Sequence, residues 1–152
     1  MTASDRASRV QAVALGFRDY LRNQTDIELP DLTDLGAIRA AHGSEGLIPV
    51  MERLDFALAQ MIDLATVYTD DARMSLEPLT VPTAALVGEY LRTTLAATWL
   101  DDDDDTQDSL VIVLPNGIAA DLTGVARSAL LSGAPNFTAV ITALISSDVS
   151  TP

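Results

Sequence analysis

The amino-acid sequence predicts an α+β fold, mostly helical, with a small antiparallel sheet or hairpin around residues 99–121 that is packed by helices. Three observations predict it. Apolar side chains recur at steps of three and four residues in several stretches before the sheet, as in helices that bury one face. Residues 110–114 are a short, partly β-branched apolar run, which is typical of a buried strand. The dipeptide Asn116-Gly117 follows, and it is a strong hairpin signal.

Four helices are expected ahead of the sheet, at about residues 4–23, 33–41, 48–68 and 83–98. The first and third carry long apolar stripes, which would suit an antiparallel pair. Pro49 fits the first position of the third helix, where a missing N–H costs nothing. Gly88 costs the fourth helix about 1 kcal/mol relative to Ala, and a close approach of another backbone would explain its presence.

The strands of the sheet are expected at residues 99–100, 110–114 and 118–121, the last of them short. Asn116 and Gly117 would then occupy the two central positions of a type I′ turn, because both of these positions need a positive φ. The sheet is thus expected to be a hairpin or a three-stranded antiparallel sheet with helices on one face.

Two helices are expected to close the chain. One spans about residues 123–131, and the other starts after a cap at Asn136. We expect a single domain over residues 1–152, with residues 1–4 and 147–152 frayed.

The charge balance is strongly acidic. The chain has 22 Asp and Glu residues against 9 basic residues, all of them Arg, and its formal net charge is -13. Phosphate backbones and anionic membrane surfaces would be repelled, so neither nucleic acid nor a membrane is an expected partner. A basic protein is the favoured partner, and the simpler alternative is that the charge only keeps the domain in solution.

The residue types needed for most catalytic chemistry are missing. The chain has no Cys, no Lys and a single His. This composition excludes disulfides, thiolate zinc sites, Cys nucleophiles, Lys Schiff bases and a P-loop lysine. We therefore expect no enzymatic activity, no cofactor and no bound metal.

An acidic run is the most conspicuous candidate site, and it consists of Asp101, Asp102, Asp103, Asp104, Asp105 and Asp108. Asp at its first, third and fifth places imitates a calcium-binding EF-hand loop. Thr106 stands where that loop requires Gly, and Ile112 where it requires Glu, so the match fails where the geometry is strictest. We interpret the run as a solvated loop and as the candidate contact with a basic partner, with a cation site as the remaining alternative.

The other polar candidates favour structural roles. His42 has no nucleophile motif beside it and suits the end or cap of a helix. Glu89 and Arg92 are three residues apart, the spacing of an ion pair on a helix surface. Asp55 and Asp63 fall outside the apolar stripe of the long helix, and no apolar pocket is evident around them.

A series of short motifs resembles a known group of proteins. It consists of Val87-Gly88-Glu89-Tyr90-Leu91, then Trp99, the strand at 110–114, Asn116-Gly117 and a helix that ends at Gly133. This order, over residues 83–133, resembles small bacterial α+β domains of unknown function, some of which lie near polymorphic-toxin immunity genes. The motifs are a glycine for close packing, a tryptophan for the core and a turn. The resemblance therefore implies a module that is not an enzyme, with no catalytic residues to transfer.

These observations lead to three functional hypotheses. The first is a non-catalytic protein-binding module of the immunity or inhibitor type, with the acidic run as its contact. The alternatives are an acidic, secretion-chaperone-like dimer that holds a client protein, and a hydrolase that uses only carboxylates.

Met1–Arg9 is polar and no apolar stretch approaches the roughly 20 residues that span a bilayer, so we expect a bacterial cytoplasmic protein, monomeric or homodimeric.

Overall fold

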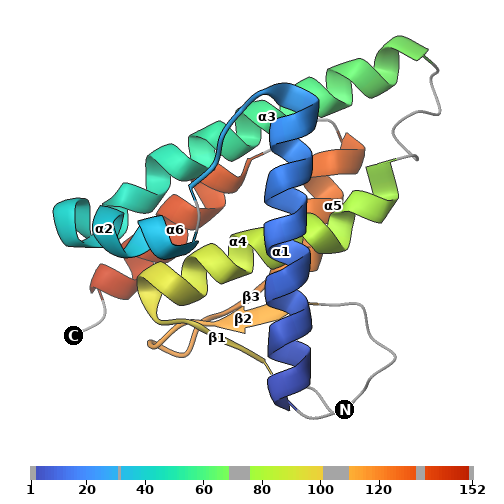
Figure 1. Cartoon of the computed structure of the whole chain (residues 1–152). Coiled ribbons are helices and arrows are strands. Elements are labelled where there is room, and N and C mark those ends of the chain that lie inside the picture. Colours follow the sequence, from blue (N-terminus) through green and yellow to red (C-terminus); the bar gives the residue numbers. More distant parts are fainter. Residues whose placement is uncertain (1–2, 31, 69–75, 101–109, 133–135, 151–152) are drawn as a thin grey trace.

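Helices and one small sheet build the fold (Figure 1). The structure, a computed structural model, describes residues 3–30, 32–68, 76–100, 110–132 and 136–150. In chain order these residues form α1 (Ala3–Thr25), α2 (Leu32–His42), the 3-10 helix η1 (Gly43–Gly46), α3 (Leu47–Tyr68), α4 (Thr80–Leu95), β1 (Thr98–Trp99), β2 (Val111–Val113), β3 (Ala119–Asp121), α5 (Leu122–Ser132) and α6 (Phe137–Ser150). The predicted class, a mostly helical α+β fold with a small antiparallel sheet, is confirmed.

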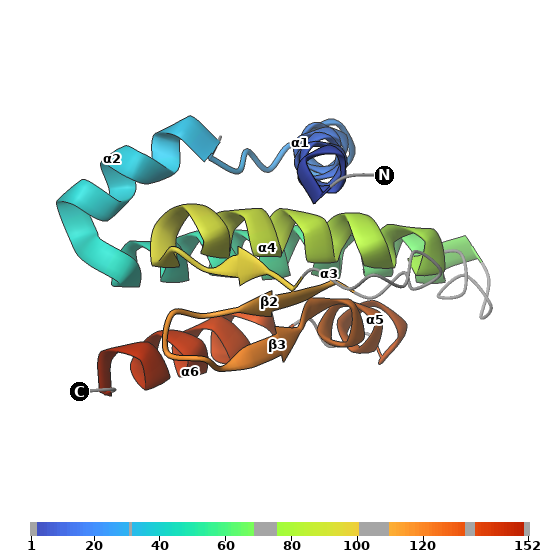
Figure 2. The same cartoon turned by 90° about the horizontal axis from the view of Figure 1, so that it is seen from below.

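Helix α4 lies at the centre of this fold. Figure 2 shows α1 and α2 on one side of it, and the sheet with α5 on the other. Contacts of α4 with α1, α2, α5 and β1 agree with this arrangement. Every residue from Thr83 to Leu91 is buried, as expected for a helix that is covered on all sides.

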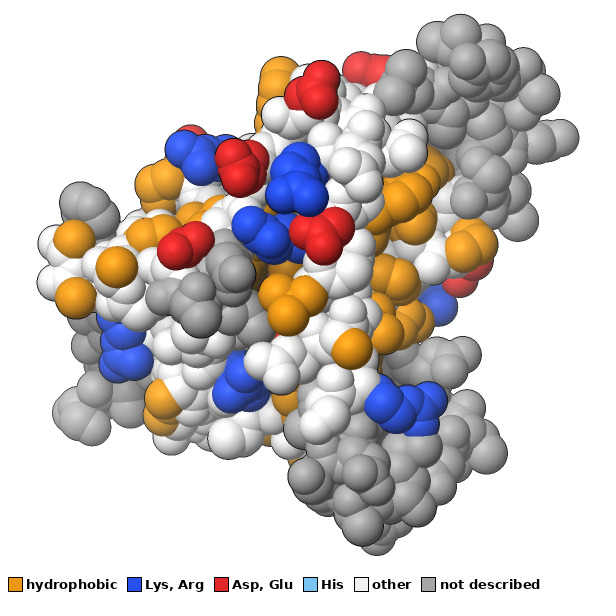
Figure 3. All heavy atoms as spheres, in the orientation of Figure 1, with side chains coloured by type: hydrophobic (Ala, Val, Ile, Leu, Met, Phe, Trp, Pro, Cys, Tyr) orange, Lys and Arg blue, Asp and Glu red, His pale blue; other side chains and the backbone are white. Residues whose placement is uncertain are grey.

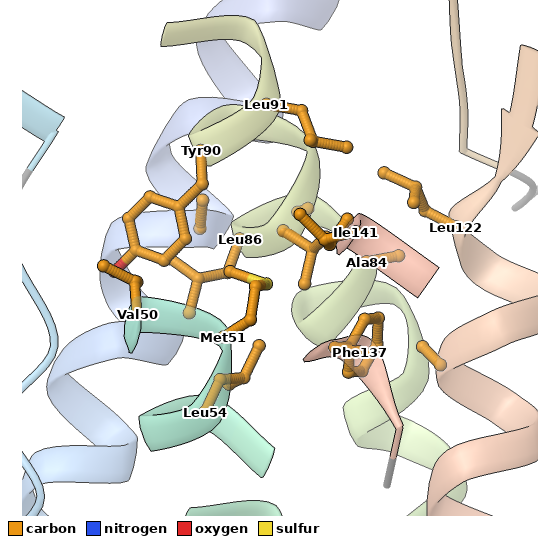
Figure 4. Close-up of a cluster of buried hydrophobic side chains, with 14 of the residues drawn as sticks. Val50, Met51, Leu54, Ala84, Leu86, Tyr90, Leu91, Leu122, Phe137 and Ile141 are labelled. Atoms are coloured by element: carbon orange, nitrogen blue, oxygen red, sulfur yellow. The ribbon is translucent and has the colours of Figure 1, made fainter. Parts of the chain in front are cut away.

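The core fills the space around α4, α3 and α6. Figure 4 shows buried side chains of these helices and of α5 close together, namely Val50, Met51, Leu54, Ala84, Leu86, Tyr90, Leu91, Leu122, Phe137 and Ile141. Each large apolar side chain in such a position stabilises the fold by about 1.5–3 kcal/mol relative to an exposed one. This cluster therefore fixes α3 and α6 relative to the central helix.

The sheet has the order β1-β2-β3, and neighbouring strands are antiparallel. Trp99 pairs with Ile112 across β1 and β2, and Ile112 pairs with Ala120 across β2 and β3. Helix α5 follows β3 directly. Asp121, the last residue of β3, caps this helix, because its Oδ1 accepts the N–H of Gly124 at 3.0 Å. The predicted strands are thus all present, with β1 shifted by one residue and β2 and β3 shorter than expected.

The turn between β2 and β3 is not the predicted type I′ turn. The N–H of Gly117 donates to the carbonyl of Leu114 at 2.9 Å, and the N–H of Leu114 donates to the carbonyl of Ile118 at 2.9 Å. Pro115 and Asn116 therefore occupy the central positions, and Gly117 follows with a φ of 91°. This is a three-residue hairpin loop, in which the last residue is left-handed. The prediction was wrong because Pro115, whose ring holds φ at about −65°, is the first central residue.

The bounds of α4 also differ from the prediction. The helix already starts at Thr80, because Pro82 is accommodated in the first turn, where its missing N–H has no helical partner. It ends at Leu95, because Ala96 takes a left-handed conformation with a φ of 57°. Thr98 therefore begins β1 instead of ending a helix.

Helices α1 and α3 do not form the expected antiparallel pair. Figure 1 shows α1 crossing both α3 and α4, and its main packing partner is α4. Helix α3 packs chiefly against α6 instead. Pro49 is the third residue of α3, not the first, and α6 extends to Ser150, through residues that were expected to fray. Within the described part of the chain, no helix combines the length and apolar composition needed to cross a membrane.

A carboxylate of α3 caps α6. Asp55 accepts the backbone N–H of Phe137 at 2.8 Å and that of Thr138 at 2.9 Å, and it also accepts the hydroxyl of Thr138 at 2.6 Å. Asn136, the predicted cap, precedes the helix, and its carbonyl accepts the N–H of Val140. The capping group is therefore a residue from another helix, and it joins α3 to α6.

Replacing Asp55 by Ala should lower the free energy of unfolding by about 1–2 kcal/mol, because two N–H groups of α6 lose their acceptor. Chemical denaturation followed by far-ultraviolet circular dichroism measures this change. The control is Glu52→Gln at an exposed position of the same helix, which should change stability by less than about 0.5 kcal/mol. Equal stability of the two variants would contradict the capping role.

Candidate functional site

The predicted partner contact is not part of the described structure. Residues Asp101–Asp105 and Asp108 lie outside the described residues, and so does the side chain of His42, whose backbone ends α2. Of the other carboxylates singled out from the sequence, Asp63 is exposed on α3, and Asp55 caps α6. The structure does not bring these carboxylates together in one site.

Glu89 is buried, which corrects the predicted ion pair on a helix surface. Its side chain is 1% exposed, and its carboxylate accepts Arg92 Nε at 2.9 Å and Arg92 Nη2 at 3.2 Å. A third donor, Trp99 Nε1, lies 2.9 Å from Glu89 Oε2. The buried charge is therefore matched by an opposite charge and by a further hydrogen bond. The prediction was wrong because the spacing makes the two residues neighbours without saying whether water reaches them.

Gly88 allows Trp99 to reach this carboxylate. A Cβ atom at Gly88 would lie 1.8 Å from Cη2 of the Trp99 ring, so the ring packs directly on the backbone of α4. A close approach does occur at this glycine, but the prediction that another backbone makes it was wrong, because the approaching group is the aromatic ring of Trp99. The left-handed Ala96 turns the chain back after α4, so that β1 contacts this helix.

The contact with Glu89 favours the charged form of Arg92. The hydrogen bonds from Arg92 to Glu89 raise the pKa of the Arg92 guanidinium above its ordinary value, although partial burial acts in the opposite direction. Because the pKa of this guanidinium is higher in the folded state, the stabilisation that comes from its charge is present below its unfolded-state pKa and is lost as the pH rises through its folded-state pKa. Arg92 therefore supplies a positive charge to this cluster at neutral pH.

The cluster of Gly88, Glu89, Arg92 and Trp99 holds the fold together, and it does not offer a site to a ligand. Both carboxylate oxygens of Glu89 already accept hydrogen bonds from the chain. The local pattern gives no signal for this burial, because Glu89 lies on the face of α4 opposite the apolar stripe of Leu86, Val87, Tyr90, Leu91 and Leu95.

A surface groove, which the sequence did not predict, lies between the segment after α1 and helices α2 and α3. We call it the α2–α3 groove. Its larger part has a volume of about 680 Å³ and is lined by Arg18, Glu28, Leu29, Pro30, Asp34, Ile38, Glu45, Gly46, Pro49, Val50 and Arg53. An adjoining part of about 560 Å³ is lined by Ile27, Glu28, Pro49, Glu52, Arg53 and Phe56. These residues come from separate segments, so no local pattern could reveal the groove.

One wall of the groove is the segment of residues 26–30, which is held at two points. Arg18 Nε of α1 donates to the carbonyl of Leu29 at 2.7 Å. The hydroxyl of Tyr90, from the central helix, donates to the carbonyl of Pro30 at 2.8 Å. An extended segment that is fixed in this way forms a preorganised wall.

The groove combines an apolar floor with a charged rim. Leu29 and Val50 are buried and lie at its floor, whereas the Phe56 side chain is 60% exposed. Four acidic side chains and two arginines line the two parts together. Figure 3 shows acidic, basic and apolar side chains interspersed over the face where α1 and α3 cross. No three His, Asp or Glu side chains are grouped as metal ligands in the portion of the chain that the structure describes.

Replacing Gly88 by Ala should lower the free energy of unfolding by about 2–4 kcal/mol, because the new methyl group displaces the Trp99 ring. Urea denaturation of the variant measures the loss. The matched control is Gly16→Ala in α1, where a Cβ meets no atom within 4 Å and should stabilise the helix by about 0.5–1 kcal/mol. A stabilising effect of Gly88→Ala would contradict the packing described here.

Replacing Arg92 by Ala should lower the free energy of unfolding by about 1–3 kcal/mol, because the buried carboxylate of Glu89 then keeps only Trp99 as a donor. The control is Arg127→Ala, which removes an exposed ion pair with Glu77 and should cost less than about 1 kcal/mol. Thermal unfolding of both variants measures the difference. Similar midpoints would show that the burial of Glu89 contributes little.

Comparison with known proteins adds no relative. The chain matches no protein-family model, no curated protein and no solved structure. The resemblance of residues 83–133 to small bacterial domains therefore stays a prediction, and the function is inferred from the chain's own residues.

Proposed function

We propose that this chain is a non-catalytic protein-binding module, of the immunity or inhibitor type, whose partner is a basic protein. The observation that carries the proposal is the surplus of negative charge in the sequence. The formal net charge is -13, and Glu89 is the one buried carboxylate among the residues for which burial is described. Such a surface speeds encounters with a positively charged protein.

The state of the buried carboxylate supports binding rather than catalysis. A general acid or base needs a carboxylate that can reach a substrate. Glu89 is instead engaged by Arg92 and Trp99, and Asp55 is engaged by the first N–H groups of α6. The acidic side chains around the α2–α3 groove are exposed to water, whereas a carboxylate-only hydrolase requires a carboxylate that is buried enough to have a perturbed pKa.

The distribution of exposed apolar side chains favours this proposal over a client-holding dimer. The large exposed apolar residues in the described part of the chain are Val13, Tyr20, Phe56, Leu100 and Ile118. They are spread over α1, α3 and the ends of the strands, whereas a chaperone-like groove needs a contiguous apolar patch.

The proposal predicts an association that depends strongly on salt. The partner is captured from the native cells with the tagged chain, identified by mass spectrometry, and purified for binary binding measurements. The association rate should fall at least about tenfold between about 50 mM and about 500 mM salt, because ions screen the attraction between opposite charges. The dissociation rate should change much less.

Two results would contradict the proposal. One is that no captured protein forms a binary complex with the purified chain. The other is that the partner is acidic, or that its association rate does not respond to salt. Sedimentation velocity of the chain alone tests the alternative, because a chaperone-like function requires a homodimer.

A further inference from the structure

We propose that the α2–α3 groove is the docking site for a short segment of the basic partner, in which a cationic residue stands next to an apolar one. This inference rests on the proposed function and names the surface and the chemistry that the partner segment must have. The larger part of the groove suits the apolar residue, and the adjoining part suits the cationic residue.

The larger part of the groove suits an apolar side chain. Leu29 and Val50 form its floor, and Pro30, Ile38 and Pro49 add further apolar lining. The wall at residues 26–30 is held in place by α1 and α4, so little ordering is needed when a ligand enters. An apolar side chain that enters this part leaves water, which favours its binding.

The adjoining part suits a cation. Glu28 and Glu52 line it together with the exposed ring of Phe56. Neither carboxylate takes part in the ion pairs found among the described residues. Two carboxylates and an aromatic face are the groups that bind the guanidinium or ammonium group of a partner residue.

The balance of charge around the groove excludes an anionic segment as the preferred ligand. The lining of the two parts contains four acidic side chains and two arginines. One of these arginines, Arg18, already donates to the carbonyl of Leu29 and pairs with Asp19 at 3.4 Å. Arg53 is therefore the main positive charge that an anionic ligand could bind here, and the acidic residues of the rim would repel such a ligand.

The two parts of the groove are adjacent, so the apolar residue and the cationic residue of the ligand must also be close together. They share Glu28, Pro49 and Arg53 in their linings. Neighbouring side chains of one partner segment can therefore fill both parts at once. A match of this kind gives specificity, because a segment with only one of the two residue types leaves either the apolar floor or the carboxylates without a partner.

A peptide titration tests the site without knowledge of the partner. The probe is a short peptide of alternating Leu and Arg residues, and the control probe has Glu in place of Arg. Backbone amide shifts in the ¹⁵N-labelled chain should change around residues 26–29 and at Val50, Arg53 and Phe56 with the first peptide only. Shifts centred on another face, no saturable binding, or equal binding of the Glu peptide would overturn the proposal.

Variants of the rim separate this site from general attraction between charges. Phe56→Ala should weaken binding of the Leu-Arg peptide about tenfold, and Glu52→Gln about two- to fivefold. Arg53→Gln should strengthen binding, because it removes a cation from the rim. The matched controls are Ile118→Ala, an apolar position that is 39% exposed, and Glu77→Gln, an acidic position outside the groove. Effects of the controls as large as those of the groove variants would refute the docking site.

The same variants distinguish failure of the site from failure of the function. A basic partner that binds the wild-type chain and the Phe56→Ala and Glu52→Gln variants with equal affinity would refute the groove and leave the proposed function standing. A chain that binds the Leu-Arg peptide in the groove, but forms no complex with any purified basic protein, would refute the proposed function.

Discussion

The burial of one negative charge is the constraint on which the rest of this structure depends. The carboxylate of Glu89 lies inside the molecule, and its burial is tolerated because Arg92 and Trp99 supply donors. Trp99 can do so only because Gly88 leaves room for its ring on the helix backbone. The tight reversal at Ala96 brings this ring back, and with it the first strand of the sheet. The attachment of the sheet to the central helix therefore depends on three side chains, those of Glu89, Arg92 and Trp99, which meet beside Gly88 on α4.

Neighbouring residues of α4 serve different sides of the molecule. Glu89 holds β1 through Trp99, whereas the hydroxyl of Tyr90 holds the carbonyl of Pro30 and thereby a wall of the α2–α3 groove. Successive side chains of a helix point about 100° apart, so a buried helix can fix two surfaces through consecutive residues. The groove and the sheet are thus positioned by the same helix, although no residue of the sheet lines the groove.

Local patterns in the sequence were sufficient for the helices, the strands and the close approach at Gly88. They were insufficient wherever a residue interacts with another residue that is far away in the sequence. The cap of α6 comes from Asp55, which is 82 residues before Phe137, and no pattern around Asn136 could reveal it. The turn at Asn116 was misassigned because the preceding proline shifts the turn by one residue. The α2–α3 groove was missed for the same reason as the cap, since its lining is assembled only by the tertiary fold.

The position of Trp99 gives the protein a built-in optical reporter. The chain contains one tryptophan, so its indole emission comes from a single place, beside a buried carboxylate and against a helix backbone. Loss of the contact between β1 and α4 would change the polarity around that ring, even while the helices remain intact. Emission and helicity would therefore separate local opening of the sheet from global unfolding, without any attached dye.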